Sequence, residues 1–262
     1  MDLNTLIFDL GDGVATITLN RPEAANAMNP EMAAELNEVA IACDQDPAVR
    51  AVVIMGTGRI FCAGGDLAGF AREGDKLPGK ILKMAGDLHL AVSRLTRMNA
   101  PVIAAVGGTA AGAGMSLAVA ADLAIAGESS KFTMAYTRAG LSPDGSSTYF
   151  LPRRIGDRRA RELMLTNRLL DAGEALSWGL VNEVVADDAV NDRARELALS
   201  LASGPTLAYG SVKTLLTQSF DNGLETQMEL ESRQIAAMSG SADGQEGIHA
   251  FLEKRKPEFR GE

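Results

Sequence analysis

The feature that most constrains the fold is an uncharged run of 24 residues between Arg97 and Asp122. In length and apolar content it is similar to a membrane helix, which needs about 20 apolar residues. It is interrupted, however, by one proline and four glycines: Pro101, Gly107, Gly108, Gly112 and Gly114. We therefore interpret the run as a buried strand, a glycine-rich turn and a buried helix, and we expect no membrane span.

Short apolar runs alternate with helical patterns along much of the chain. Buried strands are predicted at 51–55, 101–106, 123–127 and 181–185, and a hairpin at 6–19. Amphipathic helices are predicted at about 30–45, 81–97 and 115–121. The second of these would bury Ile81, Ala85, Leu88, Val92 and Leu95. This order predicts an α/β fold with mostly parallel strands.

Beyond Asp187 the sequence predicts only helices, with breaks at 204–205 and 239–244. We divide the chain into a core at residues 1–200 and a C-terminal helical region at residues 201–262. The helical patterns of that region have more apolar faces than an isolated appendage should expose. They either pack on the core or bind a partner chain, and both possibilities remain open.

The composition argues against several functional classes. Twenty-five basic and 34 acidic residues give a net charge of −9, which disfavours sequence-independent nucleic-acid binding. Two histidines and two cysteines without a CxxC pair predict no metal site and no disulfide framework. The first residues lack the basic and apolar regions of a signal peptide, so we predict a cytoplasmic protein.

Two glycine-rich loops each follow a buried strand and lead into a helix. One contains IFCAGGDL, after the strand at 51–55, and the other contains GTAAGAGMS, after the strand at 101–106. Small residues leave backbone N–H groups accessible, and a helix N-terminus adds partial positive charge. Two such loops side by side would aim two N–H groups at one oxygen, forming an oxyanion hole. Glycine-rich turns also serve as simple packing devices, and their spacing alone leaves that explanation open.

Five segments, in order along the chain, carry a resemblance: NRPEAANAMN, FCAGGDL, PVIAAVGGTAAGAGMSLAVAADLAIA, LSWGLVNEVV and FLEKRKPEF. Over about residues 6–259 they resemble the crotonase family, the enoyl-CoA hydratase/isomerase superfamily. The resemblance implies a spiral of ββα units with a C-terminal helical region that forms trimers, or hexamers of two trimers. It also implies an acyl-CoA thioester as ligand, with coenzyme A as part of the substrate and no separate cofactor.

The same resemblance assigns residues to a site. The N–H groups of Gly65 and Ala113 would hold the thioester oxygen, with alanine at 113 where many members have glycine. Four residues would lie along the CoA channel: Ala24, Ala63, Asp66 and Leu67. Arg21 and Lys254 are candidates for the CoA phosphates, the basic tail at 254–256 reaching a neighbouring subunit. A solvated charge run is the simpler explanation of that tail.

The two glutamates of the family's hydratases fall on Ser116 and Tyr136 in this chain. Adding water to a double bond needs one group to take a proton and another to give it, so we do not expect hydration by the usual route. Asp144 falls where similar isomerases carry a catalytic aspartate. Because one base suffices to shift a double bond, we predict a double-bond or ring-epoxide isomerase. Tyr136 would hydrogen-bond Asp144 or line the pocket, and the alternative for Asp144 is an N-cap near Ser146.

Three other functions remain open: a hydratase, a dehalogenase and a non-catalytic acyl-CoA-binding protein. The family's 4-chlorobenzoyl-CoA dehalogenase uses an aspartate at this position as nucleophile, with a histidine base that would fall on His89. Its pocket relies on tryptophans, whereas this chain has only Trp178. His89 also lies on a mostly apolar helix, where a structural histidine is an equally good explanation.

Overall fold

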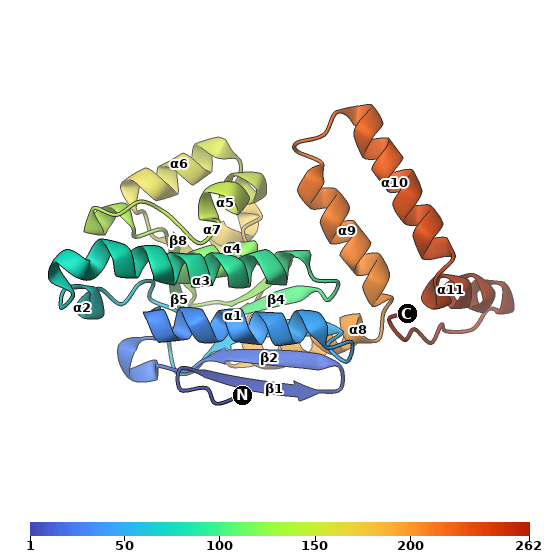
Figure 1. Ribbon diagram of the computed structural model, residues 1–262, viewed down its shortest axis with the longest axis horizontal. Coiled ribbons are helices and arrows are strands. Elements are labelled where there is room, and N and C mark those ends of the chain that lie inside the picture. The colour runs from blue at the N-terminus through green and yellow to red at the C-terminus, as the bar shows by residue number, and fades with distance from the viewer.

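The computed structural model describes residues 1–262 and contains two sheets enclosed by helices (Figure 1). The larger sheet has the strand order β1-β2-β3-β4-β6-β9. Its strands are β1 (Leu6–Gly11), β2 (Val14–Leu19), β3 (Ala51–Gly56), β4 (Val102–Val106), β6 (Leu123–Gly127) and β9 (Glu183–Val185). Only the β1–β2 pair is antiparallel. The predicted α/β fold with mostly parallel strands is confirmed.

A second, smaller sheet was not predicted. It contains β5 (Thr109–Ala111), β7 (Lys131–Thr133) and β8 (Leu170–Asp171), in the order β5-β7-β8. These strands are too short for their own residues to show a period of two, and β5 lies in the segment expected to be a glycine loop. Two successive units of the chain place one strand in each sheet and then form a helix: β4, β5 and α4 (Ala113–Ala120), and β6, β7 and α5 (Ser147–Ile155).

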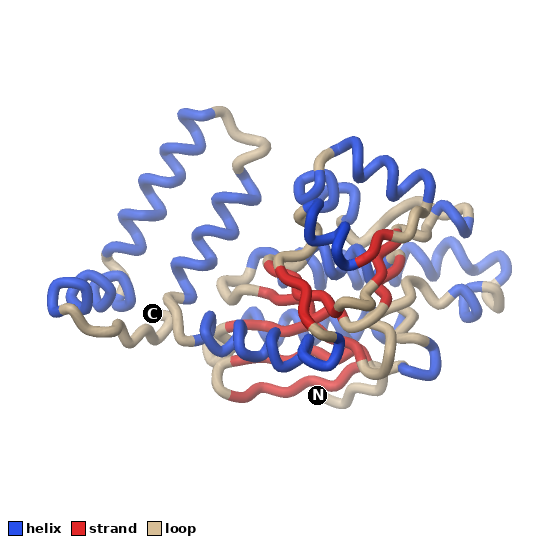
Figure 2. The backbone as a smooth tube through the Cα atoms, turned by 180° about the vertical axis from the view of Figure 1, so that it is seen from behind, coloured by secondary structure: helices blue, strands red, loops and turns tan.

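Helices cover both faces of the larger sheet. Val52 and Ile54 of β3 belong to the core shared with α1 (Pro30–Gln45) and α3 (Leu77–Arg97). Ala51 and Val53 point the other way, into the core formed with α8 (Val190–Ala202). Figure 2 shows the molecule from behind, where α8 lies against the strands. Burial on both faces explains why this strand has no polar alternation.

The remaining helices of the core are α2 (Leu67–Phe70), α5 (Ser147–Ile155), α6 (Asp157–Thr166) and α7 (Ala172–Trp178). Short 3₁₀ turns lie at Pro22–Ala24, Gly74–Lys76, Thr137–Ala139 and Asp187–Ala189. None of the helices combines the length and apolar composition needed to cross a bilayer.

The prediction for α3 needs a correction. The helix begins at Leu77, four residues earlier than expected, and Leu88, Val92 and Leu95 are buried as predicted. Ile81 and Ala85 are only partly buried and line a cavity instead. They lie in the N-terminal part of α3, which extends past the end of α1 in Figure 1. Hydrophobic periodicity identifies the apolar face of a helix, but it does not tell whether that face packs in the core or lines a cavity.

The C-terminal helices α9 (Thr206–Gln218), α10 (Leu224–Ser239) and α11 (Ala242–Glu253) form an arm that projects from the core (Figure 1). Lys213 anchors α9, because its buried Nζ donates to the carbonyls of Leu95 at 3.0 Å and Ala100 at 2.8 Å and lies 2.8 Å from Asp122 Oδ2. Burial lowers the pKa of Lys213, although Asp122 opposes the shift. Large apolar side chains of the arm are exposed, among them Leu216, Phe220, Leu224, Ile235 and Phe251.

A buried carboxylate joins the N-terminus to α1. Glu35 accepts hydrogen bonds from the backbone N–H groups of Asn4 at 2.7 Å, Thr5 at 3.0 Å and Leu6 at 3.1 Å, and from the Thr5 hydroxyl. Burial alone would raise the pKa of the Glu35 carboxyl, but these hydrogen bonds outweigh it and hold the pKa below the ordinary value of 4.5. The ionised form therefore stabilises the fold.

The Glu35→Gln variant is expected to lose about 1–3 kcal/mol of unfolding free energy at neutral pH, because an amide group cannot accept all these bonds. A folded-state pKa below the unfolded one gives stability that is present above pH 4.5 and is lost as the pH falls through the folded pKa. The difference from wild type should therefore shrink on acidification. Urea denaturation at neutral and acidic pH measures it, with Glu38→Gln, exposed on the same helix, as control. If the difference in unfolding free energy between wild type and Glu35→Gln stays constant with pH, the ionised Glu35 carboxylate is not its source.

Candidate active site

The two glycine-rich loops lie side by side, as their sequences suggested. Cys62 N–H donates to the Thr109 carbonyl at 3.2 Å, and Ala111 N–H donates to the Cys62 carbonyl at 2.9 Å. A Cβ on Gly114 would lie 2.4 Å from the Cys62 carbonyl oxygen, and one on Gly64 would lie 3.1 Å from the Ala111 oxygen. Gly64 also has a φ of +98°. Only glycine allows the two backbones to approach this closely.

Two backbone N–H groups from these loops face the same cavity. Gly65 N–H donates no hydrogen bond within the protein. Ala113 is the first residue of α4, so its N–H has no acceptor in the helix, and none outside it. Ala113 is not in the left-handed region, so alanine fits this position without strain. The structure thus brings both predicted donors to one cavity, where they are free to bind an oxygen.

The cavity has a volume of about 370 Å³, within the usual range for small-molecule sites. Its wall is largely apolar and comes from α3, the segment before α2, and the turns preceding α4 and α5. Of the predicted channel residues, Ala63 and Leu67 line it. The polar side chains in its wall are Tyr136, Ser142 and Asp144. Asp144 is therefore the one carboxylate that borders this cavity.

A chain of hydrogen bonds holds the Asp144 carboxylate. The Tyr136 hydroxyl donates to Asp144 Oδ1 at 2.6 Å, and Ser116 Oγ lies 2.9 Å from the Tyr136 hydroxyl. Burial, and after it the negative charge of Asp144, raises the pKa of Tyr136, so the phenol keeps its proton. Tyr136 both lines the cavity and binds Asp144, the two arrangements considered from the sequence.

The turn that carries Asp144 is tightly constrained. Gly145 has a φ of +60°, and a Cβ there would lie 2.9 Å from Ser116 Cβ. Ser146 follows with a φ of +68°. Ser147 donates to the Asp144 main-chain carbonyl from its N–H at 3.2 Å and its hydroxyl at 2.9 Å. The Asp144 side chain accepts no N–H of α5, so the alternative that it caps this helix is wrong.

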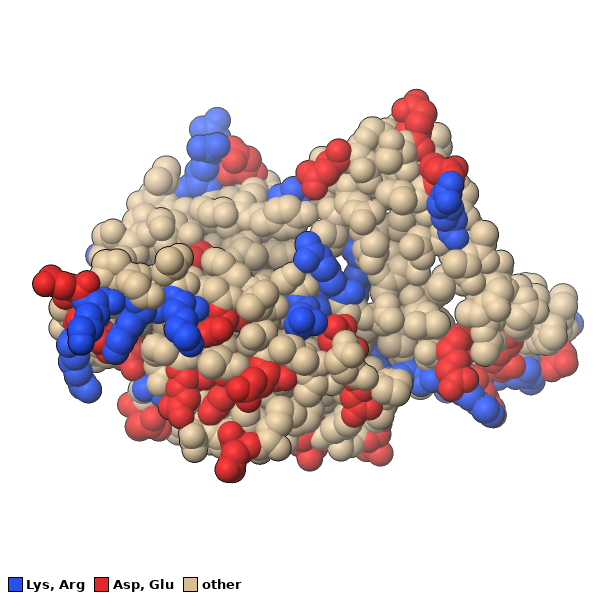
Figure 3. All heavy atoms as spheres, viewed as in Figure 1, with Lys and Arg blue, Asp and Glu red and all other residues tan.

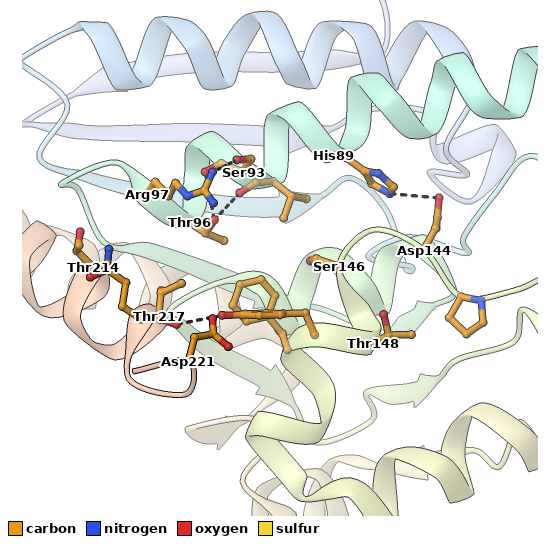
Figure 4. A pocket seen from close by; sticks show the side chains of 15 residues that line it. His89, Ser93, Thr96, Arg97, Asp144, Ser146, Thr148, Thr214, Thr217 and Asp221 are labelled. Carbon is orange, nitrogen blue, oxygen red and sulfur yellow. Dashed lines mark hydrogen bonds and ion pairs between the residues drawn. The ribbon is translucent and has the colours of Figure 1, made fainter. Parts of the chain in front are cut away.

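His89 lies on the other side of the aspartate. Its Nε2 accepts a hydrogen bond from Gly145 N–H at 3.1 Å and lies 3.9 Å from Asp144 Oδ2. The imidazole is half exposed and lines a second cavity of about 730 Å³ (Figure 4). The resemblance had placed His89 at this site, and the structure brings it beside Asp144. Its bond to Gly145, 56 residues away, had no signal in the sequence.

Other residues that the resemblance assigned to coenzyme A binding lie outside this cavity of about 370 Å³. Arg21 pairs with Asp66 at 3.1 Å and donates to the Ala27 carbonyl. Asp66 also accepts the Gly69 N–H at 2.9 Å, and this bond, followed by Arg21, keeps the pKa of Asp66 below its usual range. The pair is largely buried and neutralises itself. Neither residue lines the cavity. The structure shows Arg21 paired within its own chain, and its contact with a phosphate of coenzyme A stays a prediction.

Ala24 and Lys254 are also away from the cavity. Ala24 ends the 3₁₀ turn at Pro22–Ala24 and is partly buried. Lys254 follows α11 at the far end of the arm (Figure 1). Within one chain it cannot reach the cavity, so a contact with ligand would require a second subunit.

Positive charge does gather at the cavity, at positions not singled out from the sequence. Figure 3 shows Lys and Arg side chains over the α2–α3 end of the molecule. The basic residues of this segment are Arg72, Lys76, Lys80 and Lys83. They alternate with the cavity-lining Pro78, Ile81 and Leu82. No group of three or more His, Cys, Asp or Glu side chains is placed to hold a metal ion.

Comparison with known proteins gives matches along the whole chain. The family described as enoyl-CoA hydratase/isomerase matches residues 9–262. The 1,2-epoxyphenylacetyl-CoA isomerase of Escherichia coli K12 is 42% identical over 252 residues, 95% of each chain. The 4-chlorobenzoyl coenzyme A dehalogenase-2 of an Arthrobacter species is 34% identical over 244 residues, 93% of this chain and 88% of the relative. The crystal structure of an enoyl-CoA hydratase from Polaromonas sp. JS666 matches with a TM-score of 0.93 at 34% identity, covering 98% of this chain and 100% of the other.

Proposed function

The chain belongs to the enoyl-CoA hydratase/isomerase family and has its crotonase fold, and from that premise we propose that it isomerises an unsaturated acyl-CoA thioester. Asp144 would act as the single acid–base residue. The thioester oxygen would bind to the N–H groups of Gly65 and Ala113. The substrate would carry a movable double bond or an epoxide fused to a ring.

The observation that carries this proposal is the single carboxylate in the cavity wall. Asp144 borders the same cavity as Gly65 and Ala113, whose N–H groups are free. At the positions of the hydratase glutamates, Tyr136 lines the cavity and donates to Asp144, and Ser116 lies 2.9 Å from the Tyr136 hydroxyl. Hydration needs a second group that gives or takes a proton on the same face. Tyr136 does not serve as this second group. Its raised pKa keeps the phenol protonated, and its proton is donated to Asp144.

The proposed reaction moves one proton. Asp144 removes a proton from C2 of a 3-enoyl-CoA, and the electrons of that bond move to the thioester oxygen. The Gly65 and Ala113 N–H groups stabilise the resulting enolate, helped by the N-terminus of α4. The proton then returns to C4 and the double bond comes to lie between C2 and C3. Tyr136 holds Asp144 Oδ1, which orients the carboxylate throughout.

We also propose that the protein works in the cytoplasm as a trimer or as a hexamer of two trimers, with the arm between subunits. The exposed apolar side chains of α9–α11 would be covered by a second copy. Lys254 forms no ion pair in its own chain, so it would be available to a neighbour's ligand. Lys80 pairs with Glu73 and Lys83 with Asp87. Arg72 and Lys76 form no ion pair, and they would supply further positive charge for the phosphates of coenzyme A.

A second candidate is hydrolytic dehalogenation of an aryl-CoA. It is favoured by His89, whose Nε2 lies 3.9 Å from Asp144 Oδ2, and by the similarity to a dehalogenase. Against it, no tryptophan lines the cavity. Trp178 packs instead against the guanidinium groups of Arg159 and Arg168, at 4.7 and 5.2 Å from its ring.

Three substrates separate the candidates. With 3-hexenoyl-CoA the protein is expected to form 2-hexenoyl-CoA, seen as the rising absorbance of the conjugated thioester. With crotonyl-CoA it is expected to form no 3-hydroxybutyryl-CoA, and rapid hydration would contradict the proposal. Chloride release from 4-chlorobenzoyl-CoA would select the dehalogenase. Binding of all three without turnover would indicate a non-catalytic acyl-CoA-binding protein.

A further inference from the structure

Asp144 borders two cavities. Its side chain lines the apolar cavity beside the glycine loops and also the cavity of about 730 Å³ enclosed by α3, α5 and α9. Figure 4 shows His89 and Asp144 at one end of this second cavity and Thr217 and Asp221 toward the other. The aspartate is therefore accessible from a side that the acyl group does not occupy.

The second cavity is polar where the first is apolar. Its wall carries hydroxyl groups at seven positions: Ser93, Thr96, Ser146, Thr148, Tyr149, Thr214 and Thr217. Arg97, Gln218 and Asp221 add further polar groups. A water molecule takes up about 30 Å³ in the liquid and needs two to four polar partners to stay in a cavity. This cavity offers room and partners for several.

The two carboxylate oxygens of Asp144 differ in their surroundings. Oδ1 accepts the Tyr136 hydroxyl at 2.6 Å. Oδ2 accepts no hydrogen bond from the protein and lies 3.9 Å from His89 Nε2. That nitrogen already accepts Gly145 N–H, so it offers no proton to Asp144 in the neutral imidazole. Oδ2 is therefore the oxygen free to take up and release a proton, and the Asp144 side chain is 27% exposed.

We infer that Asp144 exchanges the proton taken from the substrate with water of the second cavity before returning it. This inference rests on the proposed isomerase function. The C2–H bond of a 3-enoyl-CoA breaks, its proton goes to Oδ2 and its electrons form the enolate. A water molecule then takes the Oδ2 proton and gives back one of its own. That hydrogen forms the new C4–H bond as the double bond moves to C2–C3, so the product carries a solvent hydrogen.

Isomerisation of 3-hexenoyl-CoA in D₂O tests this inference. We expect most molecules of 2-hexenoyl-CoA to carry deuterium at C4, measured by mass spectrometry and NMR at low conversion. Product that keeps only protium at C4 would show direct return of the proton and overturn the inference. If no 2-hexenoyl-CoA forms at all, the double-bond isomerase function on which the inference rests fails instead, so the two failures are distinguishable.

Narrowing the second cavity tests whether the proton exchanges with water of that cavity. Ser93 lies one turn after His89 on α3, and Thr148 lies on the facing α5. The Ser93→Leu/Thr148→Leu variant should exclude water near Asp144 and lower the deuterated fraction of the product. That fraction is a ratio within the product, so it does not depend on how much enzyme is folded. Ser200→Leu, exposed on α8, serves as control and should leave the fraction unchanged.

If the deuterated fraction does not change in the double variant, the exchange takes place in the apolar cavity beside the glycine loops. That result would overturn exchange through the second cavity. If the double variant fails to fold, the single Ser93→Leu variant carries the same expectation with a smaller fall. The wild-type result in D₂O decides the exchange itself in either case.

Discussion

The Asp144→Asn variant is expected to bind acyl-CoA but to lose isomerase activity by about 10²–10⁴-fold, the usual contribution of general acid–base catalysis. The substitution keeps the size of the side chain, and its amide oxygen still accepts the Tyr136 hydroxyl, which lies 2.6 Å from Oδ1 in wild type. It removes the only carboxylate of the cavity, so no group remains to take the C2 proton. Steady-state kinetics with 3-hexenoyl-CoA, together with calorimetric binding of a saturated acyl-CoA, separate catalysis from binding.

The matched control for this variant is Asp157→Asn, since Asp157 is exposed at the start of α6 and pairs only with Arg161. It is expected to retain the wild-type rate. Wild-type activity of Asp144→Asn would exclude Asp144 as the base. Equal loss of rate and of acyl-CoA binding would instead indicate a collapsed site.

The Ala113→Pro variant is expected to lose about 10²–10³-fold in turnover, the typical effect of removing one oxyanion-hole donor. Proline replaces the hydrogen of this N–H with the Cδ of its ring, so it removes the donor and also occupies the space of the hydrogen. Ala113 is the first residue of α4, the position at which a helix tolerates proline. The preceding Gly112 has a ψ of −121°, outside the helical range that proline disfavours in the residue before it. Stopped turnover with a folded protein would therefore reflect the missing hydrogen bond.

Asp157→Pro controls for the proline itself, because residue 157 is the first of α6 and follows a glycine in the same way. Thermal unfolding of both variants reports any loss of stability. Turnover of Ala113→Pro within a few-fold of wild type, with an intact fold, would show that the thioester oxygen does not bind this N–H.

The sequence predicted those elements whose signals lie within a few neighbouring residues, such as a helix cap or an apolar run. Asn29 accepts the Met32 N–H and caps α1 where the sequence placed an N-cap, and the uninterrupted apolar run of β3 lies between two helical layers. The glycine loops were also recognised, because clustered glycines after a buried strand leave the backbone accessible. The roles given to Gly65, Ala113 and Asp144 came from the resemblance, and the spacing alone would not have assigned them.

What escaped prediction depends on residues distant in sequence. β8 has two residues and exists only because it pairs with β7 about 40 positions earlier, through Lys131 and Asp171. The contact of His89 with Gly145 has the same origin. The pairing of Arg21 with Asp66 was likewise not predicted, because 45 residues separate the two.

The parts of the site come from successive turns of one spiral. Gly65 follows β3, Ala113 follows β4 and β5, and Asp144 follows β6 and β7. The contact between Gly114 and Cys62 fixes the two N–H groups without involving the segment that carries the aspartate. The residue proposed as acid and base could therefore be exchanged during evolution while the two N–H groups proposed to bind the thioester oxygen stay in place. A new reaction on this scaffold would then require changes at one or two positions.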